Sequence, residues 1–96
     1  MSALTRNIPT NRSTALSNVS AQVVAANAGR NGLIIQNCDA SIVIAINLTG
    51  AAAVVNGAGS LTMAAGATLL LDTLVPTSAI QAISASGTPN ITILEF

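Results

Sequence analysis

The stretch Ile42-Val43-Ile44-Ala45-Ile46-Asn47 decides the fold of this chain. Isoleucine recurs at every second position, and valine, alanine and asparagine lie between the isoleucines. Successive side chains of a β-strand point to opposite faces of the sheet, so a period of two gives one strongly apolar face and one milder face. The pattern therefore predicts a central strand whose isoleucines lie in the core.

Short β-rich runs continue on both sides of this stretch, from residue 19 to residue 96. Gly and Asn, which tolerate positive φ, cluster between the runs at residues 27–32 and 56–57, and Pro76 marks a corner or an edge. We predict an all-β domain over residues 19–96, a small β-sandwich or jelly-roll-like barrel of about seven short antiparallel strands. The expected core consists of Leu33, Ile35, Ile42, Ile44, Ile46, Leu69, Leu71, Ile80, Ile83, Ile91 and Ile93.

Residues 1–18 differ from this domain, because they contain two of the three arginines, three asparagines and Pro9, and show neither a strand nor a helix period. We predict an extended N-terminal arm that lies on a neighbouring subunit or protein shell, the alternative being a terminus without fixed structure. Proline favours an extended chain, arginine can pair with carboxylates, asparagine can bind exposed backbone, and isolated apolar residues can anchor the arm. The residues expected to make these contacts are Arg6, Asn7, Ile8, Pro9, Asn11, Arg12 and Leu16.

The ionisable residues are too few and too scattered for an obvious catalytic site. The chain has no His or Lys, and its acidic residues are Asp39, Asp72 and Glu95. General acid–base catalysis needs groups that titrate near neutrality, and a Ser or Thr nucleophile needs a base. The spacing of the three carboxylates matches no metal-binding loop. We therefore expect no enzyme, no catalytic residues, no cofactor and no metal site.

Two other residues have open interpretations. Cys38 has no second cysteine to pair with, and we expect a small buried apolar side chain, a free reactive thiol being the alternative. Arg30 lies between Gly29 and Asn31 just before a strand, where a surface or inter-strand hydrogen-bonding role is favoured over ligand binding.

The formal net charge of zero favours association with other copies or other proteins. Three isolated arginines do not form the basic cluster that nucleic-acid binding needs, so no nucleic-acid partner is expected. Neither an apolar span of about 20 residues nor a signal peptide is visible, which predicts no membrane partner and synthesis in the cytosol. The expected partner is therefore protein, including the chain itself.

Arg30 precedes an expected strand that ends in Gln36-Asn37, a turn follows, and the alternating stretch from Ile42 to Ile46 leads to Gly50 and further Gly-rich sequence. This order of features resembles a pattern common in small structural proteins of tailed bacteriophages. Residues 29–38 and 42–50 carry this part of the resemblance, and residues 61–66, 75–80 and 85–95 look like the remainder of the same pattern. The similarity covers about residues 23 to 96, so the arm lies outside it.

The resemblance implies a compact β-module on the virion, made in the host cytoplasm. Its implied role is that of a capsid decoration (cement) protein, which binds the major capsid protein and stabilises the head shell as a homo-oligomer, commonly a homotrimer. The alternative is the base or another component of a head or tail fibre with a receptor-binding role. The aromatic residue often found in the second alternating strand of the pattern is absent from this chain.

Overall fold

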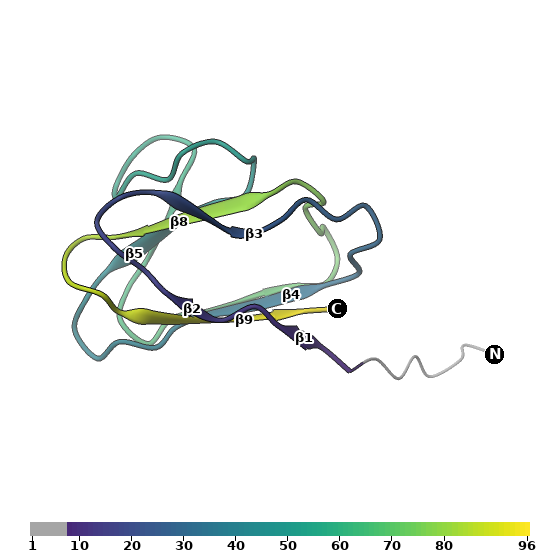
Figure 1. Cartoon of the computed structure of the whole chain (residues 1–96), viewed down its shortest axis with the longest axis horizontal. Coiled ribbons are helices and arrows are strands. Elements are labelled where there is room, and N and C mark those ends of the chain that lie inside the picture. Colours follow the sequence, from purple (N-terminus) through teal and green to yellow (C-terminus); the bar gives the residue numbers. More distant parts are fainter. Residues whose placement is uncertain (1–7) are drawn as a thin grey trace.

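The computed structural model describes residues 8–96, which form nine strands in two antiparallel sheets and contain no helix. The two sheets lie as separate layers, with β3, β5 and β8 in one and β2, β4 and β9 in the other (Figure 1). No helix long and apolar enough to cross a membrane is present in this range. The strands are β1 (Thr10–Asn11), β2 (Thr14–Ala15), β3 (Ala21–Val24), β4 (Leu33–Asn37), β5 (Ile44–Asn47), β6 (Leu61–Met63), β7 (Thr68–Leu71), β8 (Ile80–Ser84) and β9 (Asn90–Glu95).

The all-β prediction is confirmed, and the number of strands exceeds the expected seven or so because of β1 and β2. Both of these two-residue strands lie in the segment that the sequence assigned to an arm. They pair antiparallel with β9, so sheet A has the order β1-β9-β4-β7 with β2 also on β9. Residues 10–15 are therefore part of a sheet of their own chain.

Sheet B has the order β3-β8-β5-β6, which makes β5 an inner strand as its alternation predicted. Both faces of β5 are buried: Ile44 and Ile46 face sheet A, while Asn47 points to the other side. The loop formed by residues 48–60 lies over that outer face. The side-chain amide of Asn47 donates to the carbonyl of Ala52 at 3.2 Å, and that of Gln81 donates to Gly50 at 3.0 Å.

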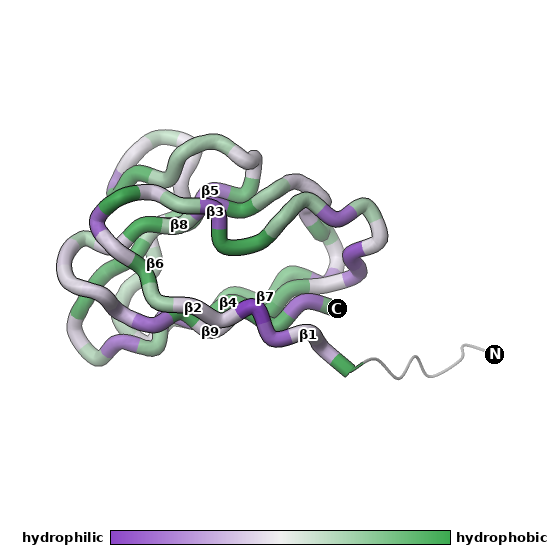
Figure 2. The backbone as a smooth tube through the Cα atoms, in the orientation of Figure 1, coloured by the Kyte–Doolittle hydropathy of each residue, from purple (hydrophilic) through white to green (hydrophobic). Residues whose placement is uncertain are grey.

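The core lies between the sheets, and Figure 2 shows apolar residues along the strands that enclose it. Of the eleven expected core residues, seven are fully covered and four are only partly buried. Ile83 is one of these four because it lies opposite Ala45 on the outer face of β8, and Ala82 takes the core position instead. Ile42 precedes β5, and Leu69 and Leu71 point inward from the edge strand β7. Residues that the expected core omitted are Leu16, Val24, Met63 and Ala82.

A one-residue bulge shapes the connection between β6 and β7. Gly66 has a φ of 76°, its N–H donates to the carbonyl of Asn37 at 3.1 Å, and Asn37 N–H donates to the carbonyl of Ala67 at 2.9 Å. This is the geometry of a bulge whose first residue needs a left-handed conformation, which glycine adopts at no steric cost. The bulge sets the register of β7 on β4, with Ile35 opposite Leu69 and Ile34 opposite Leu70.

Candidate functional site

The N-terminal segment lies along the outer edge of β9. Thr10 is opposite Glu95 and Thr14 is opposite Ile91. Between the two short strands, Arg12 N–H donates to the carbonyl of Ile93 at 2.8 Å, and Ser13 Oγ accepts the N–H of Ile93 at 3.1 Å. The segment thus satisfies backbone groups of β9 that would otherwise be exposed.

The structure places the seven expected contact residues of the arm in different environments. Ile8 is 94% exposed, Pro9 is half-buried, and Asn11 is exposed with its side-chain oxygen accepting the N–H of Ser13 at 2.9 Å. Leu16 is only 4% exposed and belongs to the core of its own chain.

The other three expected contact residues are Arg12, Arg6 and Asn7. Arg12 is half exposed and pairs with Glu95. Arg6 and Asn7 lie outside the described residues. Contact of the arm with a neighbouring subunit stays a prediction.

The two described arginines converge on one carboxylate at the end of the molecule where β4 begins. Glu95 Oε2 lies 2.8 Å from the Nε of Arg30, and its Oε1 lies 3.1 Å from the Nε of Arg12. The side chain of Arg30 is completely buried, and its two terminal nitrogens donate to the carbonyls of Pro76, Ser78 and Ala25. Arg30 therefore ties the start of β4 to the segment before β8 and to the end of β3, the hydrogen-bonding role that the sequence favoured.

Two opposing effects act on the pKa of Glu95. Burial raises the pKa because it disfavours the charged form, whereas hydrogen bonds from Arg30, Arg12 and Asn27 lower it. The hydrogen bonds outweigh burial, so the pKa of this carboxyl lies below its ordinary value. Glu95 stays ionised at neutral pH and compensates the charge of the buried guanidinium.

An asparagine closes the opposite end of β4. Asn37 is completely buried, and its side-chain nitrogen donates to the carbonyls of Ile42, Met63 and Ala64 at 2.8, 3.3 and 3.1 Å. Next to it, backbone hydrogen bonds from Ser41 and Ile42 lower the pKa of Asp39. These side chains hold loops in place and leave no free acid–base pair at this end.

The expectation that Cys38 is buried is wrong. Its side chain is exposed, and its Sγ lies 2.9 Å from the Oγ1 of Thr92. Cys38 follows β4 and its N–H donates to the carbonyl of Asn90, which places it beside β9 on the outer face of sheet A. A free thiol, the alternative from the sequence, is what the structure has at this position.

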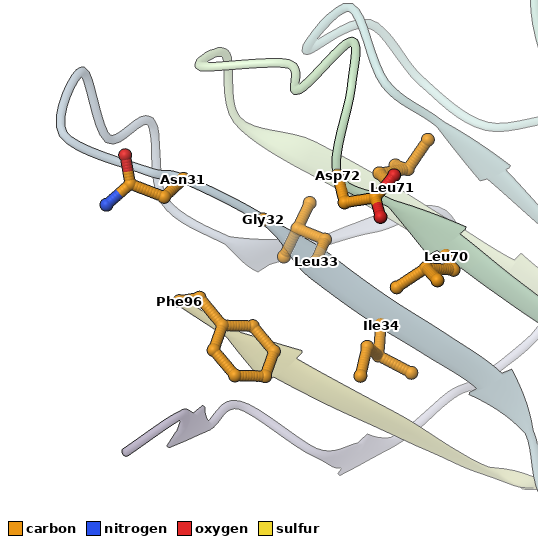
Figure 3. Close-up of a pocket in the computed structure, with 8 residues that line it drawn as sticks. All are labelled: Asn31, Gly32, Leu33, Ile34, Leu70, Leu71, Asp72 and Phe96. Carbon is orange, nitrogen blue, oxygen red and sulfur yellow. The ribbon is translucent and has the colours of Figure 1, made fainter. Parts of the chain in front are cut away.

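The outer face of sheet A carries an apolar row that the sequence analysis missed. Leu70, Ile34 and Leu94 are opposite one another on β7, β4 and β9, and Phe96 follows directly after β9. Ile34, Leu70, Phe96 and Asp72 line a depression of about 540 Å³. Figure 3 shows these side chains at the strands that carry them. The signal was present in the three consecutive leucines of β7, because alternation that turns Leu69 and Leu71 inward must turn Leu70 outward.

The apolar row on sheet A is thus the exposed apolar feature that the described strands of this sheet present to solvent. Within residues 8–96, no three His, Cys, Asp or Glu side chains come together in a way that could hold a metal ion. Comparison of the chain with protein-family models, with curated proteins and with solved structures finds no match.

Proposed function

We propose that this chain is a structural protein of a bacteriophage virion, a capsid decoration (cement) protein that binds the major capsid protein and stabilises the head shell. In this proposal residues 10–96, which include β1, β2 and the core residue Leu16, form a small jelly-roll-like β-sandwich that acts as a homo-oligomer, with three copies as the expected number. The phage setting and the number three come from the resemblance of residues 23–96 to small phage structural proteins. The proposal that the protein assembles with other protein chains is supported by the apolar outer face of sheet A.

The observation that carries the proposal is the apolar outer face of sheet A. Leu70 is 59% exposed there, and Ile34, Leu94 and Phe96 continue the surface across neighbouring strands. Apolar side chains that lie next to one another on an exposed face are typical of a site that binds another protein or a membrane. With a net charge of zero, the chain also lacks the repulsion that keeps copies apart.

Buried side-chain hydrogen bonds at both ends of β4 suit a rigid structural module. Arg30 and Asn37 each join three or more backbone segments through buried side-chain hydrogen bonds, one at each end of β4. Buried polar networks that are fully satisfied make a fold rigid, and a rigid module loses little conformational entropy when it docks on a lattice.

Titration onto phage heads tests the proposed function. Purified protein is added to complete phage particles that lack it, bound protein is located by cryo-electron microscopy, and the temperature at which the head shells break is measured. We expect saturable density at equivalent positions on the shell and a higher breaking temperature. Density on the tail or on a fibre would support the alternative role, and absence of binding to heads would refute decoration.

Deletion of residues 2–9 tests the arm separately, because this change leaves β1 and β2 in place. It removes Arg6, Asn7, Ile8 and Pro9 but keeps Leu16 in the core. If the arm attaches the module to its neighbours, the truncated protein stays folded and binds heads more weakly. Binding equal to that of the full chain would mean that these residues do not contribute to attachment.

A further inference from the structure

The edge strand β7 of sheet A has a free side. Among residues 8–96, β7 pairs with β4 alone, whereas the other outer side of the sheet, along β9, is covered by β1 and β2. Natural edge strands are usually protected by lysine, proline, bulges or an overlying loop. The Thr-Leu-Leu-Leu sequence of β7 contains none of these protective residues, and the bulge at Gly66 lies before the strand begins.

The hydrogen bonds of β4 show which backbone groups of β7 are free. Cys38 N–H donates to Asn90 and Phe96 N–H donates to Gly32, so the even-numbered residues of β4 bond to β9. In an antiparallel ladder the hydrogen-bonded residues alternate, so the odd-numbered residues of β4 bond to β7. Their partners are Leu69 and Leu71. The N–H and C=O groups of Thr68 and Leu70 therefore point away from the sheet.

The side chains of β7 are incompletely covered on both faces. Leu70 is 59% exposed on the outer face, in line with Ile34. Leu69 and Leu71 pack against the core from the inner face but remain only partly buried. A further strand along β7 would bond to the free backbone groups and cover apolar side chains on both faces.

We propose that this further strand is β7 of a second copy of the chain, paired antiparallel about a two-fold axis at Leu70. A two-fold axis through any residue of β7 keeps the outward backbone groups opposite each other, and the axes at Leu69 and Leu70 are the two nearest the middle of the strand, where the two copies overlap most. With the axis at Leu70, the Leu70 side chains of the two copies are opposite each other, Leu69 is opposite Leu71, and Thr68 is opposite Asp72.

The sequence favours the axis at Leu70 over the axis at Leu69. Apolar side chains meet apolar side chains on both faces, and each Asp72 carboxylate meets a Thr68 hydroxyl rather than a second carboxylate. The axis at Leu69 would instead place Leu70 opposite the polar Thr68. The pairing at Leu70 also joins the two apolar rows, so that the row formed by Leu94, Ile34 and Leu70 continues into the same three residues of the second copy.

This pairing is independent of the proposed function, because it requires no capsid. If three copies form a ring through other contacts, and the two-fold axes meet the three-fold axis at right angles, β7 joins two rings into a closed assembly of six. If no ring forms, β7 makes a dimer. In both cases, blocking β7 halves the mass of the assembly.

The experiment uses charges at position 70 and measures mass by analytical ultracentrifugation, with circular dichroism as a check on the fold. Leu70→Asp and Leu70→Lys each place like charges opposite each other across the axis, so each variant alone should have half the wild-type mass. An equimolar mixture of the two should regain the wild-type mass, because opposite charges then meet. Leu61→Asp is the matched control on β6, since Leu61 is a comparably exposed leucine, and it should leave the mass unchanged.

Three results would overturn the proposal: a wild-type mass equal to that of Leu70→Asp, no recovery in the mixture, or the same loss of mass in Leu61→Asp. If charges at position 70 unfold the module, Leu70→Cys in a Cys38→Ser background gives a second readout. Oxidation should then link two chains through position 70, because the Cα atoms of a hydrogen-bonded cross-strand pair are about 5.5 Å apart, within reach of a disulfide. A product that stays monomeric on a non-reducing gel would refute the pairing.

Discussion

Replacement of Glu95 by glutamine should remove a large part of the stability of this protein. The change keeps the shape of the side chain but deletes the charge that compensates Arg30, whose side chain is completely buried. Removing one partner of a buried ion pair costs about 3–5 kcal/mol, and the half-exposed pair with Arg12 adds about 0.2–1 kcal/mol. Arg30 keeps its three carbonyl acceptors and can bond to the glutamine oxygen, which places the expected loss near the lower end, at about 3 kcal/mol.

A loss of this size is easily measured. It corresponds to a fall in Tm of about 12–24 °C for a domain of this length. The chain has no Trp or Tyr, so unfolding in urea is followed by far-ultraviolet circular dichroism rather than by fluorescence. Asp72→Asn is the control, because this exposed carboxylate accepts only a hydrogen bond from Thr73 in the described structure, and it should change stability by less than about 0.5 kcal/mol.

The pH dependence provides a second test of the same change. The pKa of Glu95 is below its ordinary value in the folded protein, so the unfolded chain takes up the proton first as the pH falls. Stability from the ion pairs is therefore complete above the unfolded pKa of about 4.5 and is lost as the pH falls through the folded pKa. The stability gap between wild type and Glu95→Gln should narrow over that range. A gap below about 0.5 kcal/mol at neutral pH, or one that does not change in acid, would refute the role of the cluster.

Two predictions concern the N-terminal segment. Leu16→Ala should reduce the free energy of unfolding by about 3–5 kcal/mol, because it leaves a cavity in the core, whereas Ile8→Ala should have no measurable effect; equal effects would mean that Leu16 is not a core residue. Ala15→Cys with Asn90→Cys, in a Cys38→Ser background, should form a disulfide within one chain, because these positions are opposite each other on β2 and β9, and covalent multimers on a non-reducing gel would instead show that the segment pairs with a neighbour.

The alternating isoleucines of residues 42–46 predicted an inner strand, and the short β-rich runs around them predicted an all-β fold, because a period of two is a local signal. The expected core departed from this rule at Ile83, because Ile80 and Ile83 are three residues apart and alternation places them on opposite faces of β8. Ile83 lies on the outer face, where Ala45 is its neighbour, and the pairing of β8 with β5 decides which of the two faces is the core. β1 and β2 could not be predicted, since two exposed residues carry no period and their strands exist only through β9.

The apolar row on sheet A and the ion pairs of Glu95 with the two arginines were predictable to different degrees. The outward position of Leu70 follows from alternation along three leucines, so this part of the surface could be found in the sequence. The pair formed by Arg30 and Glu95 could not, because 65 residues separate them and no spacing rule links them. Cys38 was misplaced for a similar reason, since its exposure depends on where β4 ends and on its position beside Thr92.

The position of β9 has a consequence for how the protein reaches its native state. Sheet A is built from residues 10–15, 33–37, 68–71 and 90–95, and β9 is the strand that joins the first of these segments to the second. Emergence of the first 89 residues from the ribosome can therefore produce the pairing of β4 with β7 but not the closed layer. Folds dominated by such distant pairings typically form in milliseconds to seconds. The chain loses the conformational entropy of closing long loops before the contacts between the distant strands can form. Until β9 docks, Leu16, Leu33 and Ile35 lack the part of their cover that β9 supplies, and exposed apolar side chains of this kind make a partly folded chain prone to aggregation.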